Sequence, residues 1–312
     1  MNDTTHAPSV LTVVGSINQD YFTFVDDFPR AGETILATSA SVGLGGKGCN
    51  QAVAAAKLGQ DTRFIGAVGA DAAGTVAVAG LDSYGVDTNG VARLDAIGTG
   101  AAYIAVSASG ENTIIVHSGA NAELSAESVH RALGSVTSGV LLIQGELTRE
   151  VNDAVAAHAR AHSLRLISNA APVAAVSDET LAASSPLIVN ETEAADLLDR
   201  AGLTPGDEPE LIAEALQQRY TTEVVVTLGA AGAVVATADE TWLQPSPRPD
   251  TVVDTTGAGD GFVGVLAASL CAGHDLRQSV LRAVTAASHS VTSRGIGDSY
   301  ATAGELEILL AG

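Results

Sequence analysis

The sequence predicts an α/β protein, a three-layer α/β/α sandwich with a mainly parallel sheet and a small β-sheet lid. Short apolar runs alternate with amphipathic helical stretches along most of the 312 residues. Several apolar runs are continuous, as expected of parallel strands that are buried on both faces. Strands and helices that alternate in this way form repeated βαβ units, which pack as one sheet between two helical layers.

The individual elements follow from the same pattern. The expected strands are the apolar runs Val10–Val14, Arg63–Val68, Val140–Gln144, Leu164–Ile167, Leu187–Val189 and Val224–Leu228. The expected helices have apolar residues at helical spacing and are Asn50–Leu58, Val151–His162, Pro209–Tyr220 and Gly261–Cys271.

Two segments, residues 18–46 and 95–119, depart from this alternation. They contain strand-like patterns without intervening helices, for example Ala101–Ser107 and Thr113–His117. Antiparallel excursions of this kind, inserted into a parallel core, form a lid or an interface. Because no internal repeat or Pro/Gly/Ser-rich linker divides the chain, we expect a single domain over residues 1–312.

Composition excludes several classes of function. Apolar residues make up 46% of the chain and charged residues 16%, which indicates a globular protein. The net charge of −21 argues against nucleic-acid binding, because phosphate backbones repel an acidic surface. No run approaches the roughly 18 apolar residues of a membrane span. Two cysteines and a polar N-terminus without a signal-peptide pattern lead us to expect a cytoplasmic protein.

The segment VVDTTGAGDGF, residues 252–262, is the most informative motif. Gly257, Ala258 and Gly259 are small residues at an expected helix start, where free N–H groups and the helix dipole attract an anion. Asp260 follows at once, and a carboxylate there can accept the proton of a hydroxyl that attacks a phosphoryl group. The alternative for this motif alone is an ordinary helix cap with a tight glycine turn.

The segment GLGGKGCNQAVAAAKLG, residues 43–59, also precedes an expected helix. Its G-x-G-x-x-G pattern lacks the acidic residue about 20 positions on that a dinucleotide fold requires. It is not a phosphate-binding Walker A loop either, because Lys47 is followed by Gly48 instead of Ser or Thr. Lys47 and Asn50 offer donors to the hydroxyls of a small polar ligand. The alternative is a flexible loop with a solvated lysine.

Polar residues also follow two expected strands, where open α/β sheets bind their ligands. Asn18 and Asp20 follow the first strand and can bind sugar hydroxyls, or they form an Asx turn. Asn190 and Glu193 follow a later strand and can orient a hydrated Mg²⁺, or they cap the next helix.

A last candidate loop follows the expected strand Val224–Leu228. Thr227, Gly229 and Gly232 leave little side-chain bulk there, so the loop can admit the flat edge of an adenine or a ribose. The alternative is a tight hairpin.

Together these segments resemble the ribokinase-like (PfkB) carbohydrate kinase family, which includes fructokinase-like and adenosine kinase-like enzymes. GSINQD, GGKGCNQAVAAAKLG, GEN…HSGAN, NETEA and DTTGAGD stand in the family's order, over a region from about residue 10 to beyond residue 300. GGKG and GAGD occur throughout the family, whereas GSINQD, NQAVAA and GEN…GAN are more particular to its ribose-phosphorylating members. The sequence departs from the family at Gly261, where Thr, Ser or Ala is usual.

The resemblance implies roles for the matching residues. Asp260 is the implied catalytic base, and Gly257, Ala258 and Gly259 are the implied anion hole for the phosphate in transit. The implied sugar positions, besides Asp260, are Asn18, Asp20, Gly46, Lys47, Gly48, Asn50 and Glu146. The implied nucleotide positions are Asn190, Thr227, Gly229, Gly232 and Gly259, with Glu193 near a hydrated magnesium. The implied site for a monovalent cation, usually potassium, consists of Asp254, Thr256, Ser290, Ser293, Gly295 and Ser299.

The activity that the resemblance implies is ATP-dependent phosphorylation of D-ribose at its primary 5-hydroxyl, with Mg²⁺ and K⁺ or another monovalent cation. It also implies a homodimer formed through the lid. Two alternatives stay open at this point. The chain acts on another sugar or a nucleoside, such as deoxyribose or a ketohexose, or it is a non-catalytic sugar or nucleotide sensor on the same scaffold.

Overall fold

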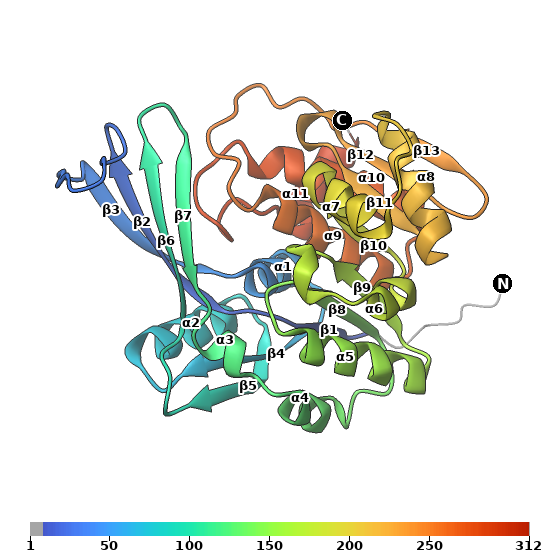
Figure 1. The fold of residues 1–312 in the computed structure, drawn as a ribbon, viewed down its shortest axis with the longest axis horizontal. Coiled ribbons are helices and arrows are strands. Elements are labelled where there is room, and N and C mark those ends of the chain that lie inside the picture. Colours follow the sequence, from blue (N-terminus) through green and yellow to red (C-terminus); the bar gives the residue numbers. More distant parts are fainter. Residues whose placement is uncertain (1–8, 312) are drawn as a thin grey trace.

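A computed structural model describes residues 9–311 and contains two β-sheets (Figure 1). The strands of the main sheet are β1 (Leu11–Val14), β4 (Thr62–Gly69), β5 (Asp87–Leu94), β8 (Val140–Gln144), β9 (Arg165–Asn169), β10 (Leu187–Asn190), β11 (Val224–Thr227), β12 (Ala233–Ala236) and β13 (Thr241–Gln244). They lie in the order β13-β12-β11-β10-β9-β8-β1-β4-β5. The pairs from β11 to β5 are parallel, and β12 and β13 are added antiparallel at one edge.

Helices cover both faces of this sheet. One face carries α1 (Lys47–Lys57), α2 (Ala72–Ser83), α9 (Ala258–Cys271), α10 (Leu276–Ser290) and α11 (Ala303–Ala311). The other carries α3 (Ala120–Glu123), α4 (Ala126–Leu133), α5 (Arg149–His162), α6 (Asp178–Ala183), α7 (Glu191–Ala201) and α8 (Pro209–Tyr220). Two short 3₁₀ turns, η1 (Val173–Ala175) and η2 (Gly229–Ala231), complete the described elements.

The strand side chains explain why the sheet needs two helical layers. In β8, Leu142 packs into the core on the α1 and α9 face, whereas Leu141 and Ile143 pack into the core on the α5 face. All three are fully buried. Continuous apolar runs therefore mark the strands, and the predicted three-layer sandwich is confirmed.

The small sheet consists of β2 (Asn18–Val25), β3 (Ser39–Gly45), β6 (Gly100–Ser107) and β7 (Asn112–His117), in the order β3-β2-β6-β7. Its strands fall within the two segments predicted for the lid. In Figure 1 this sheet extends away from the main body, and β1 leads directly into it through β2. The prediction of a separate lid sheet is thus confirmed.

The topology also sets the position of the site. Strand order reverses beside β1, which pairs with β8 on one side and β4 on the other. Open α/β sheets bind ligands at the carboxyl ends of strands at such a reversal. Helices α1 and α9 both contact β1 and β8 there. Within residues 9–311, no helix is long and apolar enough to cross a membrane.

Candidate active site

Asp260 lies in the first turn of α9, where the turn Gly257–Gly259 becomes helix. Gly257 is the N-cap and has φ of 76°, in the left-handed region that favours glycine. Two amides of α1 hold the Asp260 carboxylate. Asn50 Nδ2 donates to Oδ2 at 3.0 Å, and Gln51 Nε2 donates to Oδ1 at 2.9 Å. Helix α1 thus fixes the plane of a carboxylate that α9 supplies.

Glu146 ties the loop before α1 to the end of β1. Its Oε2 accepts hydrogen bonds from Ser16 Oγ at 2.5 Å and from the backbone N–H of Lys47 at 2.9 Å. Asp260 is the largest cause that raises the pKa of Lys47, which therefore stays charged beside that carboxylate. At the same turn, Gly46 has φ of 91° and no space for a Cβ against the Ser16 carbonyl. The loop before α1 consequently places its backbone and the Lys47 ammonium beside the Glu146 carboxylate.

Asp20 is buried beside these charges. Burial raises its pKa to about 7, and the nearby carboxylates of Glu146 and Asp260 add to the shift. Its Oδ1 is buried and has no hydrogen-bond partner within the described part of the chain. The carboxylate lies directly over Gly45, where a Cβ would collide with it. A buried carboxyl oxygen without a partner is free to accept a ligand hydroxyl.

A cavity opens next to Glu146, with a volume of about 460 Å³. Its wall includes Asn18, Glu146 and Asn121. Asn121 Nδ2 donates to Asn18 Oδ1 at 2.8 Å, and the backbone N–H of Ile17 donates to Asn121 Oδ1 at 3.0 Å. The start of α3 therefore sets the orientation of Asn18 in the cavity wall.

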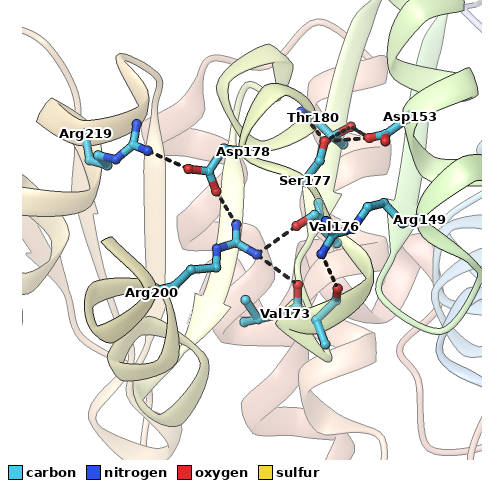
Figure 2. Close-up of polar contacts among 10 residues, drawn as sticks. Arg149, Asp153, Val173, Val176, Ser177, Asp178, Thr180, Arg200 and Arg219 are labelled. Atoms are coloured by element: carbon cyan, nitrogen blue, oxygen red, sulfur yellow. Dashed lines mark hydrogen bonds and ion pairs between the residues drawn. The ribbon is translucent and has the colours of Figure 1, made fainter. Parts of the chain in front are cut away.

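Pro172, another part of that wall, begins the turn that contains η1. Figure 2 shows how arginines hold this turn. Arg200 donates to the Val176 carbonyl at 2.9 Å and to Asp178 Oδ1 at 2.6 Å, and Arg149 donates to the Ala174 carbonyl at 3.1 Å. Helices α5 and α7 thus fix the turn behind the cavity.

A second cleft, of about 690 Å³, lies against Ala258 and Gly259. Its lining includes the predicted nucleotide residues Thr227, Gly229 and Gly232 together with Ala258 and Gly259. Strands β11 and β12 form an antiparallel hairpin around η2, so the loop after β11 is both a hairpin and part of a pocket wall. Small residues leave room there for a flat ligand.

Asn190 and Glu193 form a capping box at the start of α7. Asn190 Oδ1 accepts from the Glu193 N–H at 2.9 Å, and Glu193 Oε2 accepts from the Asn190 N–H at 2.8 Å. Burial raises the pKa of Glu193, and its carboxylate is close enough to raise the pKa of Lys47. Asn190 is paired in register with Thr227 on β11. Asn190 and Glu193 therefore cap α7, and Glu193 also lies near Lys47 of the site.

The residues expected around a monovalent cation lie in the loop before α9, at the last residue of α10 and in the loop after α10. They are Asp254, Thr256, Ser290, Ser293, Gly295 and Ser299. The Asp254 N–H donates to the Val291 carbonyl at 3.2 Å, and Asp254 Oδ1 accepts from the Thr256 N–H at 2.9 Å. The Ser299 N–H donates to the Gly295 carbonyl at 3.1 Å. These groups are hard oxygen donors, which suit an alkali cation.

Tyr300 explains the departure at Gly261. A Cβ at Gly261 would lie 2.9 Å from the Tyr300 ring, so the ring occupies the space that a side chain would need. The Tyr300 hydroxyl donates to the Gly257 carbonyl at 2.9 Å. Gly261, the residue after Asp260, has no side chain because the Tyr300 ring, from the loop after α10, packs against the turn.

Several residues of the site, or of the buried hydrogen-bond network behind it, were not singled out from the sequence. They are Ser16, Gln51, Asn121, Gln144, Asn169, Pro172 and Tyr300. One signal was available: Gln144 and Asn169 end apolar strands, and a polar residue at that place in a parallel sheet points toward the ligand edge. The others act through contacts between distant segments, which no local pattern reveals.

The fold is shared with known proteins. A family model described as pfkB family carbohydrate kinase matches residues 9–303. The chain belongs to the pfkB family of carbohydrate kinases, which confirms the resemblance drawn from the motifs.

Three individual proteins illustrate the similarity. The chain is 37% identical over 303 residues to ribokinase of Bacillus subtilis, with 96% of this chain and 99% of that protein covered. It is 33% identical over 295 residues to deoxyribokinase of Salmonella typhi, with 93% and 95% covered. The structure of Arabidopsis thaliana ribokinase complexed with ribose and ATP superimposes with a TM-score of 0.86 at 30% identity, covering 98% of this chain and all (100%) of that one.

Proposed function

We propose that this chain transfers the γ-phosphoryl group of ATP to the primary 5-hydroxyl of D-ribose and forms D-ribose 5-phosphate and ADP. The observation that carries the proposal is the placement of Asp260. Two amides of α1 hold its carboxylate, and it directly follows Ala258 and Gly259, which line the cleft of small residues. A separate cavity beside Glu146 has polar side chains in its wall. Similarity to ribokinases along nearly the whole chain, one of them solved with ribose and ATP, supports this choice of substrates.

In the proposed reaction, Asp260 accepts the proton of the sugar hydroxyl as its oxygen bonds to the γ-phosphorus. The bond from the γ-phosphorus to the bridging oxygen of ADP breaks. The start of α9 at Gly259 faces the phosphate in transit, and the helix dipole favours its negative charge. The Ala258 N–H donates to the Thr255 carbonyl at 3.2 Å, so that group would have to leave this partner to bind the phosphate. Asp20, Asn18, Lys47 and the other implied sugar positions orient ribose.

Two ions complete the proposal. A hydrated Mg²⁺ fits beside Asn190 and Glu193, because Mg²⁺ keeps several waters and needs few protein oxygens. K⁺ or a similar monovalent cation fits the oxygen-rich loops at residues 254–256 and 290–299. These ions would neutralise phosphate charge and support the Gly257 turn.

We extend the proposal to a cytoplasmic homodimer that pairs through the lid. Val42, Tyr103 and Ile115 lie in one cross-strand row of the small sheet, at 57%, 53% and 66% exposure. An apolar row this exposed on a small sheet is suited to a second copy. Light scattering of wild type and Ile115→Glu tests this: wild type should have twice the monomer mass and the variant the monomer mass.

A coupled ADP-release assay over a panel of sugars and nucleosides tests the activity, with and without K⁺. The proposal requires turnover with ribose that exceeds turnover with any other substrate. Preference for 2-deoxyribose would keep the mechanism and replace the sugar, an outcome that the similarity to a deoxyribokinase makes worth including. Sugar binding without ADP release from any substrate would instead indicate a sensor.

A further inference from the structure

Three side-chain amides lie buried behind Asp260. Gln51 belongs to α1, Gln144 ends β8 and Asn169 ends β9. Their exposed fractions are 0%, 1% and 7%. At this depth Gln51 does not reach a substrate, and buried amides have to be hydrogen-bonded to be tolerated.

The amides form one connected chain that ends on the carboxylate. Gln51 Nε2 donates to Asp260 Oδ1 at 2.9 Å and to Asn169 Oδ1 at 3.0 Å. Gln144 Nε2 donates to Gln51 Oε1 at 2.8 Å. Asn169 Nδ2 donates to the Ile188 carbonyl at 3.3 Å. Both hydrogens of the Gln51 amide group are therefore used, one on Asp260 and one on Asn169.

A backbone carbonyl fixes the direction of the whole chain. The Ile188 oxygen belongs to β10 and only accepts, so Asn169 turns its NH₂ toward it and its oxygen toward Gln51. Gln51 then directs its NH₂ to Asn169 and Asp260 and its oxygen to Gln144. An amide reversal at Gln51 would place oxygen against oxygen at two contacts, so Asp260 always meets a donor.

The spacing of the helices depends on a glycine. A Cβ at Gly264, one turn after Asp260, would collide with the Gln51 carbonyl oxygen. The absence of a side chain lets α1 and α9 approach closely enough for the amide to reach the carboxylate.

We propose that Gln51 is a positioning residue for Asp260 in the phosphoryl-transfer step. With Asn50 on Oδ2 and Gln51 on Oδ1, each carboxylate oxygen accepts one fixed N–H and keeps lone-pair capacity for the attacking hydroxyl. Gln51 prevents rotation of the carboxylate away from that hydroxyl. This inference rests on the proposed function, since it assigns a task to the base of that reaction.

The test compares Gln51→Met with Gln144→Met. Methionine approximates the length of glutamine but donates no hydrogen bond. Gln51→Met breaks the bond to Asp260, whereas Gln144→Met removes a neighbouring buried amide of the same network and leaves that bond in place. We expect kcat to fall roughly 10- to 100-fold in Gln51→Met, because small misplacements of a reacting group have effects of this size. In Gln144→Met we expect kcat to fall no more than about threefold.

A structural role alone would lower the unfolding temperature of both variants without separating their kcat values. KM for ribose and ATP, and the ribose Kd from calorimetry, should stay close to wild type in both. If Gln51→Met does not fold, Gln51→Asn keeps an amide that is too short to reach Asp260 and should show the same loss of kcat.

Unchanged kcat in folded Gln51→Met, or an equal loss in Gln144→Met, would overturn the inference while the wild-type turnover upholds the proposed function. Wild type that turns over another sugar leaves the same comparison to be made with that sugar. Wild type without turnover on any sugar would overturn both proposals.

Discussion

The two cavities of the candidate site are built from different groups. The cavity beside Glu146 is bounded by polar side chains whose atoms are aimed by hydrogen bonds, as Asn121 aims Asn18. The cleft beside Gly259 is lined mainly by small and apolar residues such as Ala230, and it offers backbone groups at a helix start. Sugar hydroxyls need donors and acceptors in defined directions, whereas a nucleotide needs space, a flat wall and N–H groups for phosphate.

Because one cavity depends on polar atoms and the other on free space, different substitutions should damage each of them. In the proposed sugar cavity, removing a polar atom should leave its buried partners unsatisfied and disturb ligand binding. In the proposed nucleotide cleft, adding atoms to small residues should be the more damaging change, because a flat ligand needs that space.

Asp260→Asn should have the largest effect. Loss of the base is expected to lower kcat about 10²- to 10⁴-fold, the range for general acid–base catalysis. An amide offers one acceptor oxygen where Asn50 and Gln51 each supply a donor, so the unfolding temperature should also fall. Steady-state kinetics and calorimetry with ribose measure the two effects. Near-normal kcat would show that another group accepts the proton.

Gly259→Ala should increase the stability of the fold and at the same time weaken the use of ATP. No atom lies within 4 Å of the added Cβ, and Gly259 lines the nucleotide cleft. Alanine in a helix should stabilise the fold by about 0.5–1 kcal/mol relative to glycine. Because the methyl group occupies the approach of the phosphates, we expect KM for ATP to rise about tenfold or more.

The matched control is Gly304→Ala. Gly304 is also the second residue of its helix and also has free space around an added Cβ. It should show the gain in stability without any change in KM for ATP. Equal kinetics in the two variants would mean that the start of α9 does not contact the nucleotide.

Asp20 should make ribose binding depend on pH. Its pKa of about 7, raised from 3.8 first by burial and then by Glu146 and Asp260, means that it is largely protonated below pH 7. Ribose hydroxyls that donate to Asp20 favour the charged form, so binding should release a proton. Affinity should then fall by up to about tenfold for each pH unit below the pKa. Lys47, charged across this range, should not contribute.

Calorimetry between pH 6 and 8, in buffers of different ionisation enthalpy, measures this proton release, and Asp20→Asn should abolish it. The same raised pKa implies that the sugar-free protein loses stability as the pH rises from 3.8 to about 7, because the folded state holds the proton more tightly than the unfolded state. Constant ribose affinity over this range would contradict the role given to Asp20.

Arg200→Met should have the smallest effect. The substitution frees the turn behind Pro172, so we expect KM for ribose to rise about three- to tenfold with kcat nearly unchanged. Such a result means that binding of the ground state and of the transition state weakens equally. Arg219→Met is the control, because Arg219 contacts Asp178 (Figure 2) and its loss should leave KM for ribose unchanged. Equal changes in both variants would indicate general loosening of this region.

Much of the fold and part of the site were predictable because their signals are local. Continuous apolar runs mark strands buried on both faces, and alternation over residues 18–46 and 95–119 marks the lid strands. The turn Gly257–Gly259 with Asp260 is also a local signal, since glycines, helix start and carboxylate are adjacent in sequence. Strand β5 and the antiparallel pair β12 and β13 were not among the predicted strands. The residues of β5 and β13 are partly exposed at the sheet edges and give a weaker pattern. Strand β12 is buried but only four residues long.

By itself, the sequence determined the layered α/β fold, its lid segments and the candidate residues for the chemistry, because periodicity and adjacent motifs are properties of the chain alone. The tertiary structure decided how those residues are oriented. Gln51 and Asp260 are 209 positions apart, and Asn18 and Asn121 are 103 apart, yet each pair is hydrogen-bonded. Such contacts exist only after α1 packs on α9 and α3 packs on β4. Folding therefore determines which buried amide meets which carboxylate.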